Sequence, residues 1–404
     1  MGPFARHRLS YLLAITAALL LGSNAVSAAD SATAADILQI RIGYLGFTPD
    51  PGPLLSNVIP EPTDAGLRGA ELAIEDSNST GRFLKQHYEL QAIEAQSPEQ
   101  LLASAREQHE QGVRLFVVNA PATILRQLSQ ALDDSLLINA GSSDDSLRQS
   151  ECLPNVLHTL PSRAMLADAL AQFLTVRKWS RWLLITGPTE GDQAYAAALR
   201  RAAKRFGHTI VAEKAWSFDN DQRRSAQAEM PLFTQTAEYD VVLVADERGD
   251  FGEYLPYHTW YPRPVAGTQG LTPTGWHKTV ETFGAAQLQK RFEARAQRWM
   301  NDRDFAAWIA VRSIATAVGK LHQSDAGAIL TLALSEQLPL DGFKGRKLSF
   351  RPWSGQLRQP IPLVQPRALV STSPQDGFLH PSSELDTLGY DQPETRCNLA
   401  AARP

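Results

Sequence analysis

Residues 114–148 read RLFVVNAPATILRQLSQALDDSLLINAGSSDDSLR and contain two short apolar runs, each followed by a loop of small and polar residues. The first run leads into NAPAT (119–123) and the second into NAGSSD (139–144). Short apolar runs bounded by turn residues are typical of buried parallel strands, and the periodic apolar residues between them predict a helix. Both loops should therefore emerge at the carboxyl edge of one parallel sheet, where open α/β folds bind their ligands.

These two loops allow two interpretations. Small residues let a ligand approach the backbone, and the free amide groups at the start of a following helix favour an anion. Ser, Asp and Gly after a strand are also ordinary helix caps and turn residues. Two such loops in consecutive strand–helix units favour a ligand site, and helix capping stays open as the alternative.

Strand and helix patterns alternate over most of the chain, which predicts α/β architecture with parallel sheets covered on both faces. Two similar halves follow one another, and long helical patterns at 285–300 and 303–323 then return to the first half. We expect two doubly wound parallel-sheet lobes joined by a multi-strand hinge, a geometry that permits closure on a ligand. The expected division is 37–160 with 275–336 for the first lobe, 161–274 with 337–371 for the second, and 372–404 for a tail.

The composition fits a globular protein and excludes several classes of partner. Of the 404 residues, 43% are hydrophobic and 20% are charged, and the net charge is only −4. No long-range field of the kind that attracts nucleic acid or anionic lipid is expected at this charge. No fixed-period repeat is present.

The amino terminus has the pattern of a secretory signal peptide. Arg6 and Arg8 precede an apolar run at 11–21, and small residues at 25–29 follow. This order predicts cleavage near Ala29, so residues 1–29 should be removed on export to the periplasm. No later run is long enough for a membrane helix, so no direct membrane insertion is expected.

The chain contains two cysteines, Cys152 and Cys397. In an oxidising compartment they are expected to form a disulfide that attaches the carboxyl-terminal tail to the middle of the chain. Two free thiols are the alternative.

Motifs of enzymatic or metal chemistry are absent from the sequence. There is no nucleophile elbow, no zinc-protease motif, no phosphate-binding loop and no dinucleotide fingerprint. The acidic pairs at 133–134, 144–145 and 246–247 lack the spacing of a calcium loop. We therefore expect no catalytic residue, no metal and no cofactor.

Several segments resemble the type I periplasmic substrate-binding proteins of ABC transporters, a group that includes the leucine/isoleucine/valine-binding proteins. The segments are IRIG (40–43), GLRGAELAIE (66–75), VVNA (117–120), LINAGS (137–142) and DFAAW (304–308), and the resemblance covers roughly residues 37–370. The proline-rich segment after Gly46, the segment FKGRKLSFR (343–351), and the 367–371 stretch with its Cys-bearing tail are similar to the branch associated with pyrroloquinoline-quinone-dependent alcohol oxidation.

The resemblance implies a ligand site built from both lobes. Its residues would be Ala120, Pro121 and Ala122 after one strand, Gly141, Ser142 and Ser143 after the next, and Asp192, Glu247 and Gln269 in the second lobe. The amino-acid binders have hydroxyl-rich first-lobe loops and an acidic residue that holds the ligand's ammonium group, whereas this chain has Ala120–Ala122 and Gln269 at those places. These departures argue against an amino-acid ligand.

The acidic residues near the site have several possible roles. Asp192, Glu247, Asp144 or Asp246 could replace the missing ammonium partner, or could bind hydroxyl groups or a cation. Solvated loop acids are the alternative.

The resemblance implies an exported monomer that captures a small polar or amphipathic molecule and delivers it to an ABC permease in the inner membrane, in a system linked to quinone-dependent alcohol oxidation. A second interpretation is a periplasmic ligand-sensing or accessory module of an alcohol-oxidising system without transport.

Overall fold

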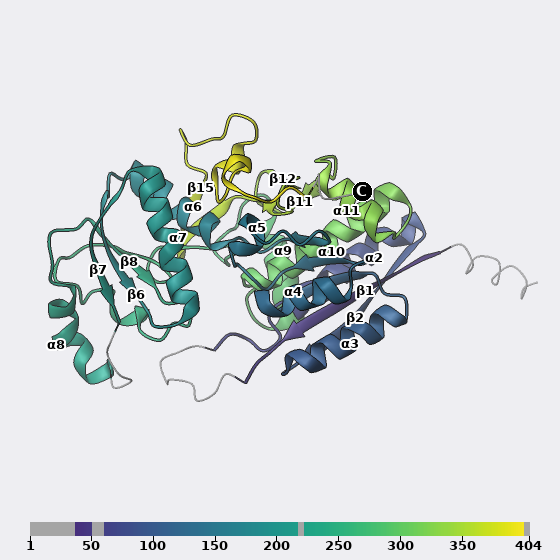
Figure 1. Ribbon diagram of the computed structural model, residues 1–404, viewed down its shortest axis with the longest axis horizontal. Helices are drawn as coiled ribbons and strands as arrows, with labels where there is room; N and C mark the ends of the chain where they lie inside the picture. The colour runs from purple at the N-terminus through teal and green to yellow at the C-terminus, as the bar shows by residue number, and fades with distance from the viewer. Residues whose placement is uncertain (1–36, 51–59, 217–221, 400–404) are drawn as a thin grey trace, which may run out of the picture.

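The computed structural model describes residues 37–50, 60–216 and 222–399 and contains two lobes arranged along its long axis (Figure 1). Each lobe is built on its own parallel sheet, as expected. The predicted signal peptide and the middle of the proline-rich segment lie outside the described residues. No helix within these ranges has the length and apolar character needed to cross a membrane.

The first lobe begins with alternating strands and helices. They are β1 (Leu38–Phe47), α2 (Leu67–Leu84), β2 (Gln86–Ala95), α3 (Pro98–Glu110), β3 (Leu115–Asn119), α4 (Ala122–Ala131), β4 (Leu136–Asn139), the short α5 (Ser146–Gln149) and β5 (Val156–His158). The five strands form a parallel sheet in the order β2-β1-β3-β4-β5.

Side-chain alternation along the strands separates two cores in this lobe. Val117 and Ile138 face the core that includes α2, whereas Phe116 and Leu137 face the core that includes α3 and α4. Successive residues of a strand point to opposite faces, so apolar runs such as LFVV require helices on both sides of the sheet. The doubly wound arrangement predicted from the sequence is confirmed.

The second lobe repeats this pattern around a smaller sheet. Its elements are α6 (Arg163–Val176), β6 (Arg181–Thr186), α7 (Glu190–Phe206), β7 (Thr209–Ala215), α8 (Gln222–Thr234), β8 (Val241–Ala245), the 3₁₀ turn η2 (Gly252–Tyr254), β9 (Val265–Gly267) and β10 (Thr272–Pro273). The parallel order is β7-β6-β8-β9. One face packs on α6 and α7, and the other on an aromatic cluster that includes Trp216 and Phe251.

The rest of the chain returns to the first lobe and then to the second. The elements are α9 (Ala285–Ala296), α10 (Asp302–Leu321), α11 (Ala326–Leu334), β11 (Leu340–Asp341), β12 (Lys347–Phe350), β13 (Leu357–Arg358), β14 (Ile361–Gln365), β15 (Ala368–Ser373) and the 3₁₀ turns η3 (Glu384–Thr387) and η4 (Gln392–Glu394).

Residues 337–371, which were expected in the second lobe, are divided between two cores. Leu340, Leu348 and Leu357 pack in the first-lobe core, whereas Ile361 and Leu363 pack in the second-lobe core. Short strands interrupted by prolines carry a local extended pattern that does not specify the sheet they join. The chain therefore crosses between the lobes near residues 359–360, later than predicted.

Apart from residues 374–399, three segments of the described chain cross between the lobes, and one buried side chain links them. The Lys344 Nζ donates to the carbonyl of Gly275 on the second crossing, and to Gln359 Oε1 at 2.5 Å and Pro360 O at 3.4 Å on the third. The Gln359 Nε2 donates to Thr159 O on the first crossing at 2.8 Å. This network fixes the crossings as one hinge.

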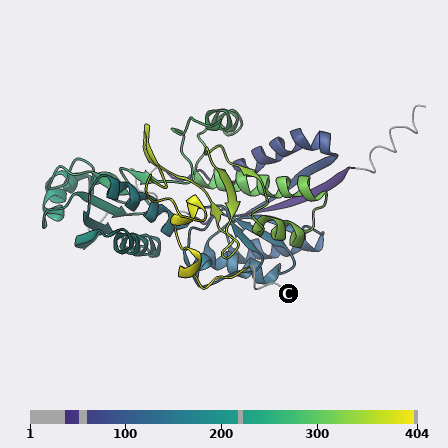
Figure 2. The same cartoon turned by 90° about the horizontal axis from the view of Figure 1, so that it is seen from above.

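Residues 374–399, which we call the C-terminal strap, lie against both lobes (Figures 1 and 2). On the second lobe, the Gly389 amide donates to the buried carboxylate of Asp168 at 2.9 Å, and Arg205 donates to the Gly389 carbonyl at 2.7 Å. On the first lobe, Arg351 and Arg358 both donate to Asp386 at 2.8 Å. The strap is therefore a second connection between the lobes.

The strap ends in the predicted disulfide, Cys152–Cys397. Beyond it, Leu399 packs in the first-lobe core and its amide donates to Trp353 O at 3.0 Å. Because the bond joins residues separated by 245 positions, it closes a very long loop in the unfolded chain.

Lys344 should make stability depend on pH. Burial lowers its pKa from 10.5 to about 7, against a smaller opposing effect of Asp302. Between these values the unfolded chain binds the proton and the folded chain releases it, so the free energy of unfolding should rise with pH, by up to about 1.4 kcal/mol per unit. Urea unfolding of wild type and Lys344→Met from pH 6.5 to about 9 measures this. A difference between the two proteins that does not change with pH would contradict it.

Replacing both cysteines by serine should lower the free energy of unfolding by about 2–5 kcal/mol, because the unfolded chain loses its cross-link. Denaturant unfolding without reductant measures the loss. Dithiothreitol should produce a similar loss in wild type and none in the double variant. Equal stability of the oxidised wild type and the double variant would show that the disulfide does not stabilise the fold.

Candidate functional site

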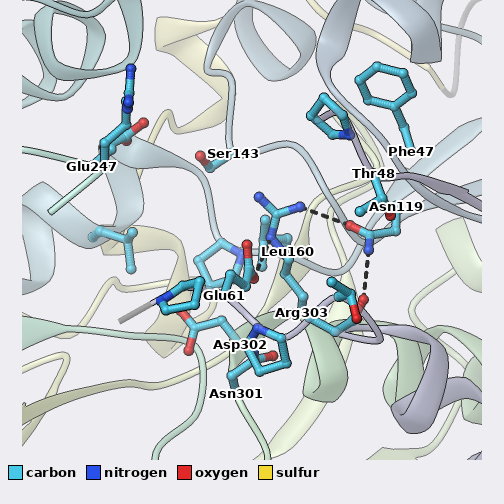
Figure 3. A pocket seen from close by; sticks show the side chains of 18 of the residues that line it. Phe47, Thr48, Glu61, Asn119, Ser143, Leu160, Glu247, Asn301, Asp302 and Arg303 are labelled. Carbon is cyan, nitrogen blue, oxygen red and sulfur yellow. Dashed lines mark hydrogen bonds and ion pairs between the residues drawn. The ribbon is translucent and has the colours of Figure 1, made fainter. Parts of the chain in front are cut away.

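A cavity of about 1160 Å³ lies between the lobes. Its first-lobe lining comprises Phe47, Thr48, Pro49, Pro60, Glu61, Pro62, Thr63, Ala65, Asn119, Ser143, Asn301, Asp302 and Arg303; the first crossing adds Leu160 and Pro161, and the second lobe adds Leu166, Glu247, Arg248 and Asp250 (Figure 3). Because its walls come from different lobes, a change in the angle between the lobes changes its shape.

Asn119, at the carboxyl end of β3, organises the first-lobe wall. Its Nδ2 donates to the Tyr44 hydroxyl at 3.1 Å and to Ala65 O at 2.9 Å, and its Oδ1 accepts from Arg303 Nη1 at 3.1 Å. Burial also raises the pKa of Tyr44, so this hydroxyl stays protonated. The amide therefore joins β1, the segment before α2 and the start of α10.

Arg303 projects from the first turn of α10 into the cavity, between Asn119 and Ser143 (Figure 3). Its Nε lies 3.0 Å from Glu61 Oε1, which attaches the end of the proline-rich segment to the wall. A cation in the first turn opposes the helix dipole. The neighbouring acids Asp302 and Asp304 in the same turn offset that cost.

The second-lobe wall centres on Glu247, in the loop after β8. Its two carboxylate oxygens accept from Arg163 Nε at 2.6 Å and Nη2 at 2.7 Å. Arg163 lies at the start of α6, and its amide donates to Ser143 O of the first lobe at 3.0 Å. This bidentate pair thus lies where the loop after β4 meets the second lobe.

Of the predicted ligand residues, Ser143 and Glu247 line the cavity. The remaining seven, Ala120, Pro121, Ala122, Gly141, Ser142, Asp192 and Gln269, do not belong to its lining. Their contact with a ligand stays a prediction.

Local hydrogen bonds explain the placement of the loop after β4. The amides of Gly141 and Ser142 donate to Asn139 Oδ1 at 3.2 and 2.9 Å, and the Asp144 amide donates to the Ser142 hydroxyl at 3.4 Å. The Ser146 amide at the start of α5, of the kind expected to favour an anion, donates to Asp144 Oδ1 at 2.9 Å, so these amides already have acceptors inside the protein. The backbone of this loop therefore has the hydrogen bonds of a turn and helix cap, which was the alternative interpretation of its sequence.

Asp192 is 1% exposed, and its carboxylate accepts two backbone amides. It forms a capping box with Thr189 at the start of α7, and its Oδ1 accepts the Glu247 amide at 2.7 Å. Asp246 likewise accepts the amides of Phe251 and Gly252 at 2.8 and 2.6 Å. Both acids hold loops in place rather than standing in solvent.

Arg303 and Asn119 line the cavity but were not among the residues predicted from the sequence. A basic residue between two acids at the start of a helix was the available signal, because it breaks the usual charge preference of a first turn. For Asn119, the available signal was that a polar residue stands at the end of a buried strand.

The fold and cavity define a two-lobe α/β protein with a site between its lobes. The sequence profile of the periplasmic binding protein family matches residues 39–252, and the chain belongs to that family. A search of curated proteins found no match.

Solved structures share the fold. A branched-chain amino acid ABC transporter periplasmic ligand-binding protein from Burkholderia xenovorans is 15% identical, with a TM-score of 0.70 over 90% of this chain and 100% of that one. An ABC transporter substrate-binding protein from Sphaerobacter thermophilus is 19% identical, with a TM-score of 0.68 over 87% and 100%. A periplasmic binding protein from Burkholderia mallei is 16% identical, with a TM-score of 0.64 over 90% and 99%.

Replacing Asp192 by Ala should lower the free energy of unfolding by about 1–3 kcal/mol, because the α7 cap and the acceptor of the Glu247 amide are lost together. Urea unfolding measures the change. Asp240→Ala, which removes the acceptor of the Ser180 and Arg181 amides far from the cavity, is the matched control. If Asp240→Ala lowers the free energy of unfolding and Asp192→Ala does not, the capping role of Asp192 is contradicted.

Proposed function

We propose that this protein captures a small solute between its lobes and delivers it to an ABC permease, without converting it chemically. The observation that carries the proposal is the cavity itself, whose opposite walls belong to different lobes. A solute bound to both walls stabilises the closed arrangement by the difference in its affinity for the closed and open forms. The binding role named for the solved relatives supports the same function.

In this proposal the first lobe comprises residues 37–160 and 275–358, the second comprises 161–274 and 359–371, and 372–404 form the tail. Ser143, Arg303 and Asn119 act on the solute from the first lobe and Glu247 from the second. The other residues implied by the resemblance would approach the solute on closure. They are Ala120, Pro121, Ala122, Gly141, Ser142, Asp192 and Gln269.

The proposal also covers the compartment and the metabolic system in which the protein acts. The amino-terminal pattern supports export with cleavage near Ala29, so the protein would act as a periplasmic monomer. The resemblance of the 343–351 segment and of the tail supports a link to quinone-dependent alcohol oxidation. Growth of a strain lacking this protein on alcohols, compared with growth on the corresponding acids, tests that link.

Replacing Ser143 by Trp should fill the cavity and abolish solute binding, because Ser143 lies on its lining. A thermal-shift screen of alcohols, aldehydes, carboxylates, amides and amino acids with wild type identifies compounds that raise the melting temperature, since a ligand that binds only the native state stabilises it. Each positive compound is then measured with the variant.

Ser180→Trp is the control, because Ser180 is exposed and lies outside the cavity. It should keep the ligand-induced shift. A full shift in the Ser143 variant would show that the solute binds elsewhere.

A further inference from the structure

Two ion pairs of the cavity wall are formed by the protein's own side chains. Arg303 lies 3.0 Å from Glu61, and both carboxylate oxygens of Glu247 are held by Arg163. The Arg163 side chain is only 15% exposed, so water would solvate it incompletely if Glu247 turned towards a ligand. Both walls therefore present charges that are already compensated.

The other charged groups of the lining also have partners. Arg248 Nε lies 3.5 Å from Asp250 Oδ2. Asp302 accepts from the Thr274 hydroxyl, from the Gly275 amide at 3.1 Å and from the Trp276 amide at 3.0 Å. The Asp302 carboxylate thus holds the second crossing in place through these hydrogen bonds.

The rest of the cavity wall is apolar or carries neutral polar groups, among them Phe47, Leu160 and Leu166 and the hydroxyls of Thr48 and Ser143.

A charged ligand would be poorly matched to this lining. A carboxylate that bound Arg303 would bring a second anion next to Glu61, and an ammonium group that bound Glu247 would displace Arg163. A charge removed from water needs a counter-charge, and taking one partner of an existing pair leaves the other partner desolvated and unpaired.

An uncharged polar group meets no such conflict. The guanidinium of Arg303 has five N–H donors and lies in the middle of the cavity, so a carbonyl or hydroxyl oxygen can accept from it while the pair with Glu61 stays intact (Figure 3). A hydroxyl hydrogen can in turn be donated to Glu247, and the apolar wall covers a hydrocarbon body.

We propose that the solute is an uncharged, amphipathic molecule that carries a hydroxyl or carbonyl group, with Arg303 as its hydrogen-bond donor and with the ion pairs of both walls excluding carboxylates, amines and zwitterions. This inference rests on the proposed capture function and specifies its ligand class.

Isothermal titration of the mature protein with two matched sets of probes tests the inference. One set is hexanol, hexanamide, hexanoate, hexylamine and norleucine, and the other is benzyl alcohol, benzamide, benzoate, benzylamine and phenylglycine. Within a set the hydrocarbon is nearly constant and the charge changes. The neutral members should bind at least about tenfold more tightly than the charged members, which is about 1.4 kcal/mol.

The variant Glu247→Gln should bind carboxylates more tightly than wild type does. A misfolded variant could not produce such an increase in affinity. The variant leaves the Arg163 guanidinium without its carboxylate, so affinity for hexanoate or benzoate should rise about tenfold while affinity for the amines does not. Glu213→Gln is the matched control, because it breaks a similar bidentate pair with Arg200 outside the cavity. It should leave every affinity unchanged.

The outcomes separate this inference from the capture function. Tighter binding of a carboxylate, amine or zwitterion to wild type, abolished by Ser143→Trp, would overturn the neutral ligand class and leave capture supported. An unchanged preference in Glu247→Gln would also overturn it. Absence of binding by every member of both sets would contradict the ligand class and the capture function together.

Discussion

The buried Nζ group of Lys344, with its acceptors, is the interaction on which the arrangement of the lobes depends. Placing this group in the interior is costly, and three oxygen acceptors together with the face of Phe305, 4.5 Å from Nζ, offset the cost. Because the acceptors lie on two crossings and Gln359 reaches the third, the crossings are held together at one place. Each lobe keeps its own cores on either side, so the connecting region is narrow.

The C-terminal strap adds a second connection with different chemistry. Asp386 is held by two arginines of the first lobe, and the Gly389 region is held by Asp168 and its arginine partners in the second. Buried charges of this kind are destabilising when one partner is removed, so they specify a single position of the strap. With the hinge at one place and the strap across both lobes, the movements open to the lobes are limited. Closure over the cavity must be compatible with both connections.

Local patterns were sufficient to predict the sheets, since apolar runs and strand–helix alternation determine which faces are buried. Of the ligand residues implied by the family resemblance, Ser143 and Glu247 lie on the cavity lining. What the sequence could not provide were roles set by distant neighbours. Arg303 reaches the cavity because α10 packs beside β3, and Lys344 matters because three remote crossings meet around it. Asp192 caps α7 and accepts the Glu247 amide, a structural role that its place in the sequence does not reveal.

The central claim is that the two lobes move about the Lys344 hinge to enclose a solute. Small-angle scattering of the wild-type protein, alone and saturated with the tightest-binding compound from the titration sets, tests it most directly. Closure predicts a smaller radius of gyration and a shorter maximum dimension in the saturated sample. Superimposable scattering curves, with binding confirmed in the same samples, would contradict the claim.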